Sequence, residues 1–209
     1  MSATSVLLTE RAAMCDTFEK FGPDAPTLCE SWTTLDLAAH LAAREARSDA
    51  AVGLVVPFLA GHLQKVMDQY KAKGYDHLVG MLRTGPPWMH RTGPLASANV
   101  NENFVHHEDV RRPAGESPRA LDEEMDQILW KMLSFGARMS RKALRGAALT
   151  LRTPDGREKV VTKDGSPVVM TGETGELILF MSGRKDAAVV THDGSDEAVG
   201  ILLAANLGV

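Results

Sequence analysis

Residues 101–110 read NENFVHHEDV, and two imidazoles and three carboxylates fall within the eight positions from Glu102 to Asp109. Neither Gly nor Pro interrupts the run, so we expect a helix over about residues 97–111. Residues three and four apart share a helix face, which places Glu102, His106 and Asp109 together and points His107 and Glu108 elsewhere. A carboxylate and an imidazole one turn apart form half of a metal site if another element supplies the rest.

Outward from this stretch, the chain reads as helices up to about residue 145. Apolar residues recur at spacings of three and four, and Thr33 and Asp36 are spaced as a capping box that starts the second helix. Gly53 and Pro57 should kink or break that helix, and a Pro/Gly-rich loop is expected over residues 84–94. The expected helices cover residues 3–20, 35–45, 58–73, 75–83, 97–111 and 121–144.

The pattern changes after about residue 145. Loose alternation and a Pro-Asp-Gly turn at residues 154–156 predict a β-hairpin, and a second turn is expected at residues 192–194. The expected strands and helices cover residues 147–153, 158–162, 167–171, 173–183, 187–191 and 195–207. We therefore predict an α+β protein with a four-helix bundle of residues 1–145 and a small α+β domain of residues 146–209.

The composition is that of an ordinary globular protein of 209 residues, with 44% apolar and 24% charged residues. A net charge of −4 and only 5% aromatic residues argue against nucleic acid or an anionic membrane as a partner. We see no signal peptide, and the longest apolar run, residues 50–60, is too short to span a bilayer. Cys15 and Cys29 make no disulfide scaffold, so we expect a cytoplasmic protein with reduced thiols.

A third ligand candidate lies on the expected second helix. His40 is set among alanines and leucines, with Asp36 and Arg44 one turn to either side. Helical bundles build metal sites from inward side chains on facing helices, and His40, Glu102 and His106 would leave a fourth position open, as in catalytic zinc sites. The alternative is a surface helix with solvated charges and a satisfied core histidine at position 40.

Two motifs carry a family resemblance. Residues 31–41, SWTTLDLAAHL, resemble the Trp-Ser/Thr-x-x-Asp-Leu-x-x-His-Leu signature of DinB-like metal-binding bundles, above all the mycothiol-dependent maleylpyruvate isomerase family. Residues 102–109, ENFVHHED, are similar to that family's Glu-x-x-x-His-His-x-Asp segment. The resemblance implies His40, Glu102 and His106 as metal ligands. Residues 28–30, 106–112 and 175–184 resemble a largely uncharacterised branch of these proteins.

The resemblance also implies a function. It predicts a divalent metal, zinc or else nickel, manganese or iron, and mycothiol as a thiol cofactor that the metal activates for attack on a small electrophile. The chain would then be an isomerase or an S-transferase; a metal- or thiol-binding module without turnover and a metal-dependent hydrolase are the alternatives. The loop after Gly85 and the C-terminal domain do not reproduce the isomerase's substrate-binding residues.

Three further side chains have two interpretations each. Asp109 either orients His106 or a cofactor group, or it forms a surface ion pair with one of the arginines of residues 111–112. Arg184, after a glycine, either reaches a cleft between the domains and binds the cofactor or has no functional role. Cys29 precedes a helix, where a thiolate can be stabilised, but without a basic neighbour in the sequence we expect little reactivity.

Arg44 and the tryptophans are the remaining candidates. Arg44 either binds an anionic group of the substrate or forms an ion pair within the bundle, with Asp36 or Glu108 as its partner. Asp36 is interpreted as a helix-start carboxylate rather than a partner of His40. Trp32 and Trp88 are interpreted as core and loop anchors rather than as surfaces on which a cofactor stacks.

Overall fold

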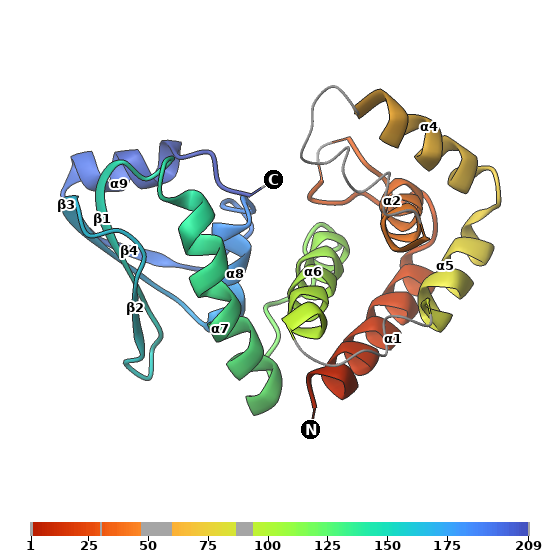
Figure 1. Cartoon of the computed structure of the whole chain (residues 1–209), viewed down its shortest axis with the longest axis horizontal. Coiled ribbons are helices and arrows are strands. Elements are labelled where there is room, and N and C mark those ends of the chain that lie inside the picture. The colour runs from red at the N-terminus through yellow and green to blue at the C-terminus, as the bar shows by residue number, and fades with distance from the viewer. Residues whose placement is uncertain (1, 30, 47–59, 87–93, 209) are drawn as a thin grey trace. The chain divides into compact units, whose positions relative to one another are not determined.

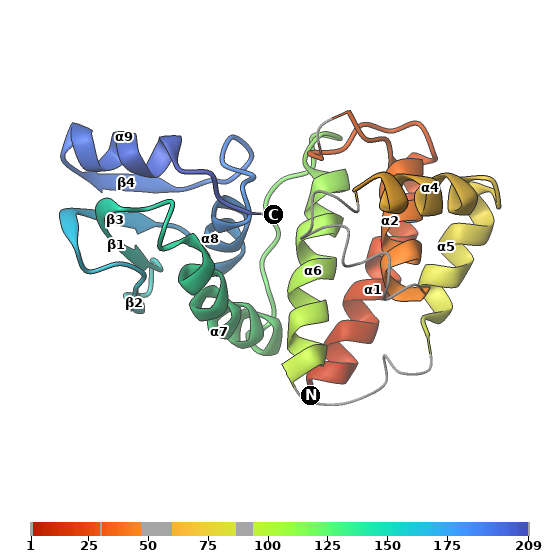
Figure 2. The ribbon, with the colours of Figure 1, turned by 45° about the horizontal axis from the view of Figure 1, so that its top comes forward.

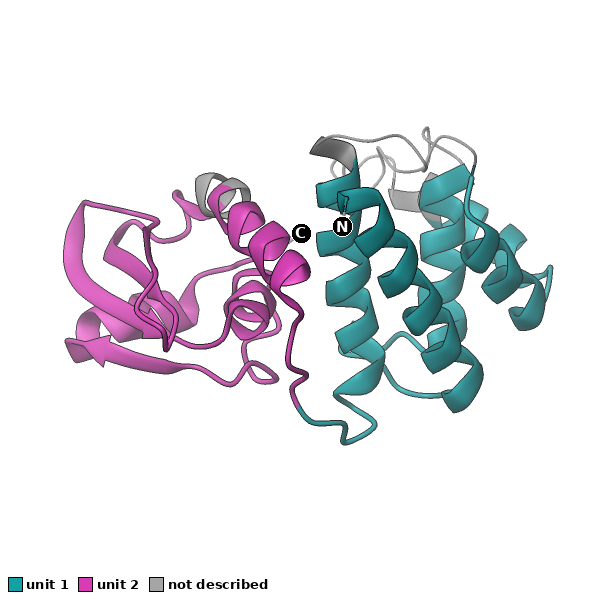
Figure 3. Cartoon of the chain, turned by 90° about the horizontal axis from the view of Figure 1, so that it is seen from below, with its two compact units in different colours: residues 1–117 teal, residues 118–209 magenta. Residues whose placement is uncertain are grey.

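The computed structural model describes residues 2–29, 31–46, 60–86 and 94–208. It divides into two compact units, residues 1–117 and 118–209 (Figure 3). Within the described residues there are eight helices and one four-stranded sheet, so the predicted α+β class is confirmed. No helix in the described ranges is both long and apolar enough to cross a membrane. Gly53 and Pro57, where a kink or break was expected, and Trp88, the expected loop anchor, lie outside the described residues.

The first unit is helical. Its elements are α1 (Ala3–Phe21), α2 (Thr34–Ala46), α4 (Ala60–Lys71), α5 (Tyr75–Thr84) and α6 (Pro94–Arg111). Helix α6 packs along α1, and α2 packs against α4 and α5 (Figures 1 and 2). Buried apolar side chains from these helices form one core, which includes Phe18, Leu37, Leu41, Leu78 and Val110. The helical periodicity of the sequence therefore located these helices to within a few residues.

Helix α2 begins where the capping pattern predicts. The Thr33 backbone N–H donates to Asp36 Oδ2 at 2.9 Å, and the Asp36 N–H reaches back to Thr33 Oγ1 at 3.4 Å. This reciprocal pair satisfies N–H groups that the first turn of a helix leaves open. Asp36 also pairs with Lys71 Nζ at 2.5 Å, so its role as a helix-start carboxylate is confirmed. The capped start fixes which residues of α2 face inward.

The second unit contains α7 (Glu123–Ser140), β1 (Gly146–Arg152), β2 (Glu158–Val160), β3 (Gly165–Thr171), α8 (Thr174–Met181), β4 (Thr191–Gly194) and α9 (Asp196–Ala204). The strand order is β2-β1-β3-β4. Strands β1 and β3 are parallel, and the other two pairings are antiparallel. Helix α9 packs on β1, β3 and β4. The predicted hairpin between β1 and β2 and the N-cap at Ser195 are confirmed.

Two expectations differ from the structure in this unit. The strand expected at residues 187–191 lies at residues 191–194 instead, so the expected turn at residues 192–194 is part of β4. Residues 187 and 188 are held in turns by the carbonyl of Arg184, while His192 and Gly194 pair with β3. Apolar residues before the strand misled the assignment because β4 itself is short and polar.

The boundary between the units also lies earlier than residue 145. Helix α7, which we assigned to the bundle, groups with the second unit and packs against α8. Arg157 in the β1–β2 hairpin bridges to Asp126 of α7, with a guanidinium–carboxylate distance of 2.6 Å. Lys159 of β2 donates to the Trp130 carbonyl of the same helix. The apolar pattern of α7 predicted a buried helix but did not indicate which core buries it.

Candidate metal centre

Helix α6 is buried through its charged segment. Residues 103–110 are all buried, although this run contains both histidines and two carboxylates. Ionised groups are tolerated in an interior only where partners satisfy them, and each of these side chains has a hydrogen-bond partner. The alternative of a surface helix carrying solvated charges is therefore wrong.

His40 reaches the same region from α2. It lies two turns into that helix and is 4% exposed, and the four alanines around it at positions 38, 39, 42 and 43 are at most 2% exposed. Such small side chains allow a neighbouring backbone to approach closely. The Trp32 ring lies against His40, with ring centroids 5.1 Å apart and an angle of 50° between the planes. Trp32 also packs on the core, in accord with its interpretation as an anchor.

The three predicted ligands come together. Candidate ligand atoms of His40, Glu102 and His106 all lie within 4.8 Å of one another. His106 Nε2 is 3.2 Å from Glu102 Oε1, and the rings of His40 and His106 are 5.7 Å apart, edge to face. Helices α2 and α6, whose ligand residues are about sixty positions apart in the sequence, thus bring together the three residues that spacing and resemblance indicated.

This donor set suits a divalent metal. Two imidazole nitrogens and one carboxylate oxygen are ligands that zinc takes in catalytic sites. Ligand atoms about 2.0–2.2 Å from a tetrahedral zinc lie about 3.3–3.6 Å from one another, close to the 3.2 Å that separates His106 Nε2 from Glu102 Oε1. The side chain of Glu102 is 31% exposed, so the set is not sealed from solvent.

The positive charges around the set favour the ionised form of the Glu102 carboxyl group. Burial by itself raises the pKa of Glu102, but the hydrogen bond and the positive charge of His106 outweigh that effect. Arg44 and His40 add positive charge, and the pKa is lowered to about 2. Glu102 is therefore ionised at any physiological pH and is ready to act as a ligand.

His106 is held between two carboxylates. Burial by itself lowers its pKa, but hydrogen bonds with two carboxylates and a thiol raise the pKa well above the ordinary value; these partners are Asp109, Cys29 and Glu102. These contacts favour the charged imidazolium form of the metal-free side chain. A metal that binds through Nε2 must displace that charge while Nδ1 keeps its hydrogen bond to Asp109.

Asp109 and Arg44 both contact the candidate ligands. Asp109 Oδ2 lies 2.8 Å from His106 Nδ1 and is fully buried, which is the geometry of a carboxylate that orients a metal-binding imidazole. The Arg44 guanidinium lies 3.7 Å from Glu102 Oε2 and is 23% exposed. Its partner is neither of the two carboxylates that the ion-pair alternative named. At this distance Arg44 forms part of the rim of the set.

The other two ionisable residues of the run face away. His107 Nδ1 is 2.9 Å from Glu10 Oε1, and its Nε2 is 2.8 Å from Thr17 Oγ1, so both ring nitrogens are bound to α1. Glu108 is fully buried and accepts hydrogen bonds from the arginines at positions 111 and 112 at 2.6 Å each. These contacts agree with the expectation that His107 and Glu108 point away from the face of Glu102 and His106.

Cys29 lies closer to the candidate ligands than its sequence neighbours indicated. Its Sγ lies 3.1 Å from Asp109 Oδ2, and the thiol, Asp109 and His106 form a second group of donor atoms within 4.8 Å of one another. We expected no basic neighbour, but the imidazole of His106 is one. The pairing spans 80 positions, so the residues adjacent to Cys29 in the chain could not reveal it.

Arg184 lies in the second unit, just after α8. Its Nη1 donates to the Ser182 carbonyl at 2.6 Å. This contact holds the guanidinium against the C-terminal end of α8, and it gives the cofactor-binding interpretation no support. The role of Arg184 in cofactor binding stays a prediction.

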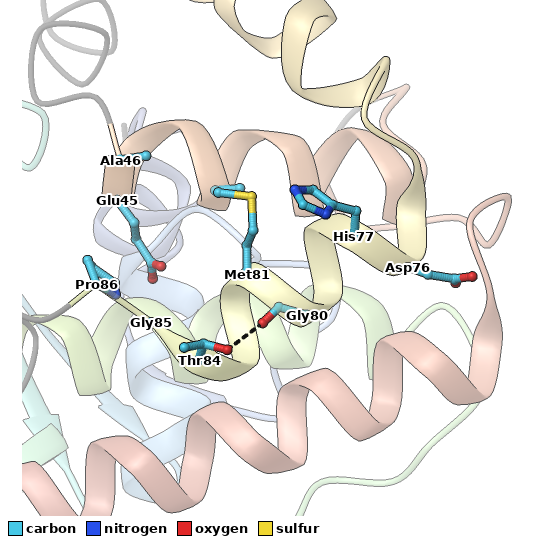
Figure 4. Close-up of a pocket in the computed structure, with 10 residues that line it drawn as sticks. Glu45, Ala46, Asp76, His77, Gly80, Met81, Thr84, Gly85 and Pro86 are labelled. Carbon is cyan, nitrogen blue, oxygen red and sulfur yellow. Dashed lines mark hydrogen bonds between the residues drawn. The ribbon is translucent and has the colours of Figure 1, made fainter.

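A cavity of about 560 Å³ lies in the helical unit, lined by residues of α2 and α5 and the two residues after α5. Figure 4 shows Glu45 of α2 and Met81 of α5 at this cavity. Glu45 is held there by a buried ion pair with Arg11, in which Nη1 and Oε1 are 2.6 Å apart. None of the three candidate metal ligands lines this cavity, so it is separate from the donor set.

The fold resembles that of a solved enzyme. No family model matches the chain, and no curated protein matches it in sequence. A crystal structure of the mycothiol-dependent maleylpyruvate isomerase aligns with a TM-score of 0.61 and 17% identity over 91% of this chain and 90% of that one. A histidine-to-alanine variant of the same isomerase aligns over the same shares with a TM-score of 0.51. At this identity the likeness shows a shared fold.

Proposed function

We propose that the helical unit is a DinB-like metal-binding bundle that holds one divalent ion, zinc in the first place, through His40, Glu102 and His106. The observation that carries the proposal is the convergence of their ligand atoms within 4.8 Å from two helices. Three protein ligands leave at least one coordination position for another molecule, as in catalytic rather than structural zinc sites.

We further propose that this open position takes a small thiol, mycothiol or a close relative, and that the protein is a thiol-dependent isomerase or S-transferase. The likeness to the mycothiol-dependent maleylpyruvate isomerase over nine tenths of both chains supports this choice. When bound, the metal and the thiol together would supply a thiolate nucleophile at neutral pH, because coordination deprotonates a thiol.

The residues of the chain divide the remaining tasks. Glu102 would offer its negative charge to the ion, and Asp109 holds the Nδ1 side of His106 so that Nε2 faces Glu102 and would be a ligand. Arg44 is partly exposed at the rim, and its guanidinium can exchange Glu102 for a carboxylate of an incoming substrate. The set thus favours electrophiles that carry a carboxylate group.

The test combines binding and turnover. Native mass spectrometry of the zinc-loaded protein should show one ion per chain and a further mass when mycothiol is added. Neither the His40→Ala variant nor the His106→Ala variant should form this complex. The control is His77→Ala, which changes an exposed histidine outside the set and should bind as the parent does.

Activity then separates the candidate functions. A panel of unsaturated carboxylic acids, maleylpyruvate among them, should react only when thiol is present. A rearranged product with unchanged mycothiol identifies an isomerase, and a product that carries mycothiol identifies an S-transferase. Turnover without thiol would point to a hydrolase, and thiol binding without turnover on any acid would point to a binding module; either result would overturn the proposal.

A further inference from the structure

Cys29 lies in a turn that backbone hydrogen bonds hold beside α6. The Leu28 N–H donates to the Asp109 carbonyl at 2.9 Å, which ties this segment to the end of α6. The Trp32 N–H closes a turn onto the Cys29 carbonyl at 2.9 Å, and Ser31 within it has a φ of +58°. Non-glycine residues rarely adopt this left-handed conformation. The position of the thiol is therefore specified by the fold at some cost in backbone strain.

The thiol completes a group of three different donor atoms. Cys29 Sγ lies 3.1 Å from Asp109 Oδ2, and His106 Nδ1 lies 2.8 Å from the same oxygen. The three atoms are within 4.8 Å of one another, Asp109 is 0% exposed and His106 is 8% exposed. Sulfur, nitrogen and oxygen are all ligands of tetrahedral zinc, and the two hydrogen-bonded contacts would lengthen by about half an ångström around an ion.

This second group uses the opposite side of the same imidazole. His106 Nε2 faces Glu102, and Nδ1 faces Asp109. A neutral imidazole has one nitrogen with a lone pair and one that carries a proton. An ion on one side therefore leaves the other nitrogen protonated, so the two donor groups compete for one ligand.

We propose that Cys29, Asp109 and the Nδ1 atom of His106 form a second metal position, one that prefers thiophilic divalent ions and that is alternative to the position formed by His40, Glu102 and His106. Binding there forms a metal–sulfur bond and a metal–nitrogen bond; the thiol proton and the Nδ1 proton of His106 leave to solvent, while Nε2 keeps its proton. The ion also withdraws His106 from the first position, so soft ions displace the metal on which the proposed activity depends. The preference follows from ligand softness, because only this group contains a thiolate.

The experiment is a titration of the metal-free, reduced protein with Cd²⁺, followed by the ultraviolet charge-transfer band of cadmium–thiolate. The parent should develop the band with one equivalent. Cys29→Ser should abolish it, whereas Cys15→Ser should retain it, because that buried thiol faces the Val79 carbonyl of α5 and belongs to no group of candidate ligands among the described residues. A band that survives Cys29→Ser, or that never appears in the parent, overturns the proposal.

Two further variants keep the result interpretable. Asp109→Asn retains the thiol but removes one ligand, so Cd²⁺ affinity should fall at least about tenfold; unchanged affinity contradicts the proposed position. His40→Ala breaks only the first donor group, so it should abolish tight Mn²⁺ binding and leave the cadmium band intact. If His40→Ala loses Mn²⁺ binding but the parent shows no cadmium band, only the second position is rejected. If the parent shows the cadmium band but His40→Ala binds Mn²⁺ as tightly as the parent, only the first position is rejected.

Discussion

His106 and His107 are neighbours on α6, and both are buried imidazoles beside a carboxylate, yet their surroundings differ. His107 and its partner Glu10 have side chains that are each 4% exposed, and the second nitrogen of His107 is bound to Thr17. The side chain of His106 is 10% exposed, and that of its partner Glu102 is 31% exposed. His107 is thus enclosed between α6 and α1, whereas His106 lies at a set that solvent reaches.

The difference shows that a carboxylate–imidazole pair is not by itself a metal site. His107 joins α6 to Glu10 and Thr17 of α1, and among the described residues it belongs to no group of three candidate ligand atoms. His106 Nε2 faces an ionised carboxylate and a second imidazole supplied by α2. We therefore assign His107 a role in the stability of the fold and His106 a role in metal binding, and four substitutions test that division.

The largest effect is expected for His106→Ala. Loss of one of three protein ligands should weaken zinc binding by more than about 100-fold, since even partners of ligands contribute 10–100-fold. His107→Ala should leave zinc affinity within about threefold because its nitrogens face α1. Competition with a chromophoric chelator measures both affinities. Equal losses in the two variants would remove the distinction between the neighbours.

Asp109→Asn should have the next largest effect. The substitution removes the negative charge that orients the imidazole at 2.8 Å, so zinc affinity should fall about 10–100-fold while the fold persists. The same chelator competition reports the affinity, and circular dichroism reports the helix content. An affinity equal to that of the parent would mean that Asp109 does not support the ligand.

His107→Ala should act on stability instead. It leaves the buried carboxylate of Glu10 without its imidazole partner, which should lower the free energy of unfolding by about 1–3 kcal/mol. Urea denaturation of the metal-free protein measures the change, with the exposed His77→Ala as the matched control. If His107→Ala lowers the free energy of unfolding no more than the control does, His107 does not stabilise the fold.

Arg44→Gln should have the smallest effect on the metal. Its contact with Glu102 is 3.7 Å long and partly exposed, and such pairs contribute about 0.2–1 kcal/mol, which is at most about fivefold in affinity. KM for a carboxylate substrate should rise while kcat changes less. If zinc affinity instead falls as far as in His106→Ala, Arg44 supports the ligand set rather than the substrate.

Local patterns predicted the parts of the fold that depend on neighbouring residues. The capping pair of Thr33 and Asp36, the N-cap at Ser195 and the spacing of Glu102 and His106 follow from helix geometry. His40 could be added because spacing and resemblance indicated the same residue. These predictions did not require knowledge of which elements meet.

Contacts between distant elements could not be predicted in this way. The partners of Cys29 and His107 lie 80 and 97 positions away, and no local pattern indicates such pairs. Helix α7 was assigned to the wrong core for the same reason, since an apolar stripe does not name its partner. Strand β4 was misplaced because its pairing with β3, rather than its own polar sequence, makes it a strand.

The most direct test of the metal site is the metal content of the purified protein and of His40→Ala after dialysis against excess zinc and removal of the unbound ion. Elemental analysis should find about one zinc per chain in the parent and far less in the variant, because His40 is the only candidate ligand of the first donor set that α2 supplies among the described residues. Far less than one ion in the parent, or equal zinc in both proteins, would contradict the account.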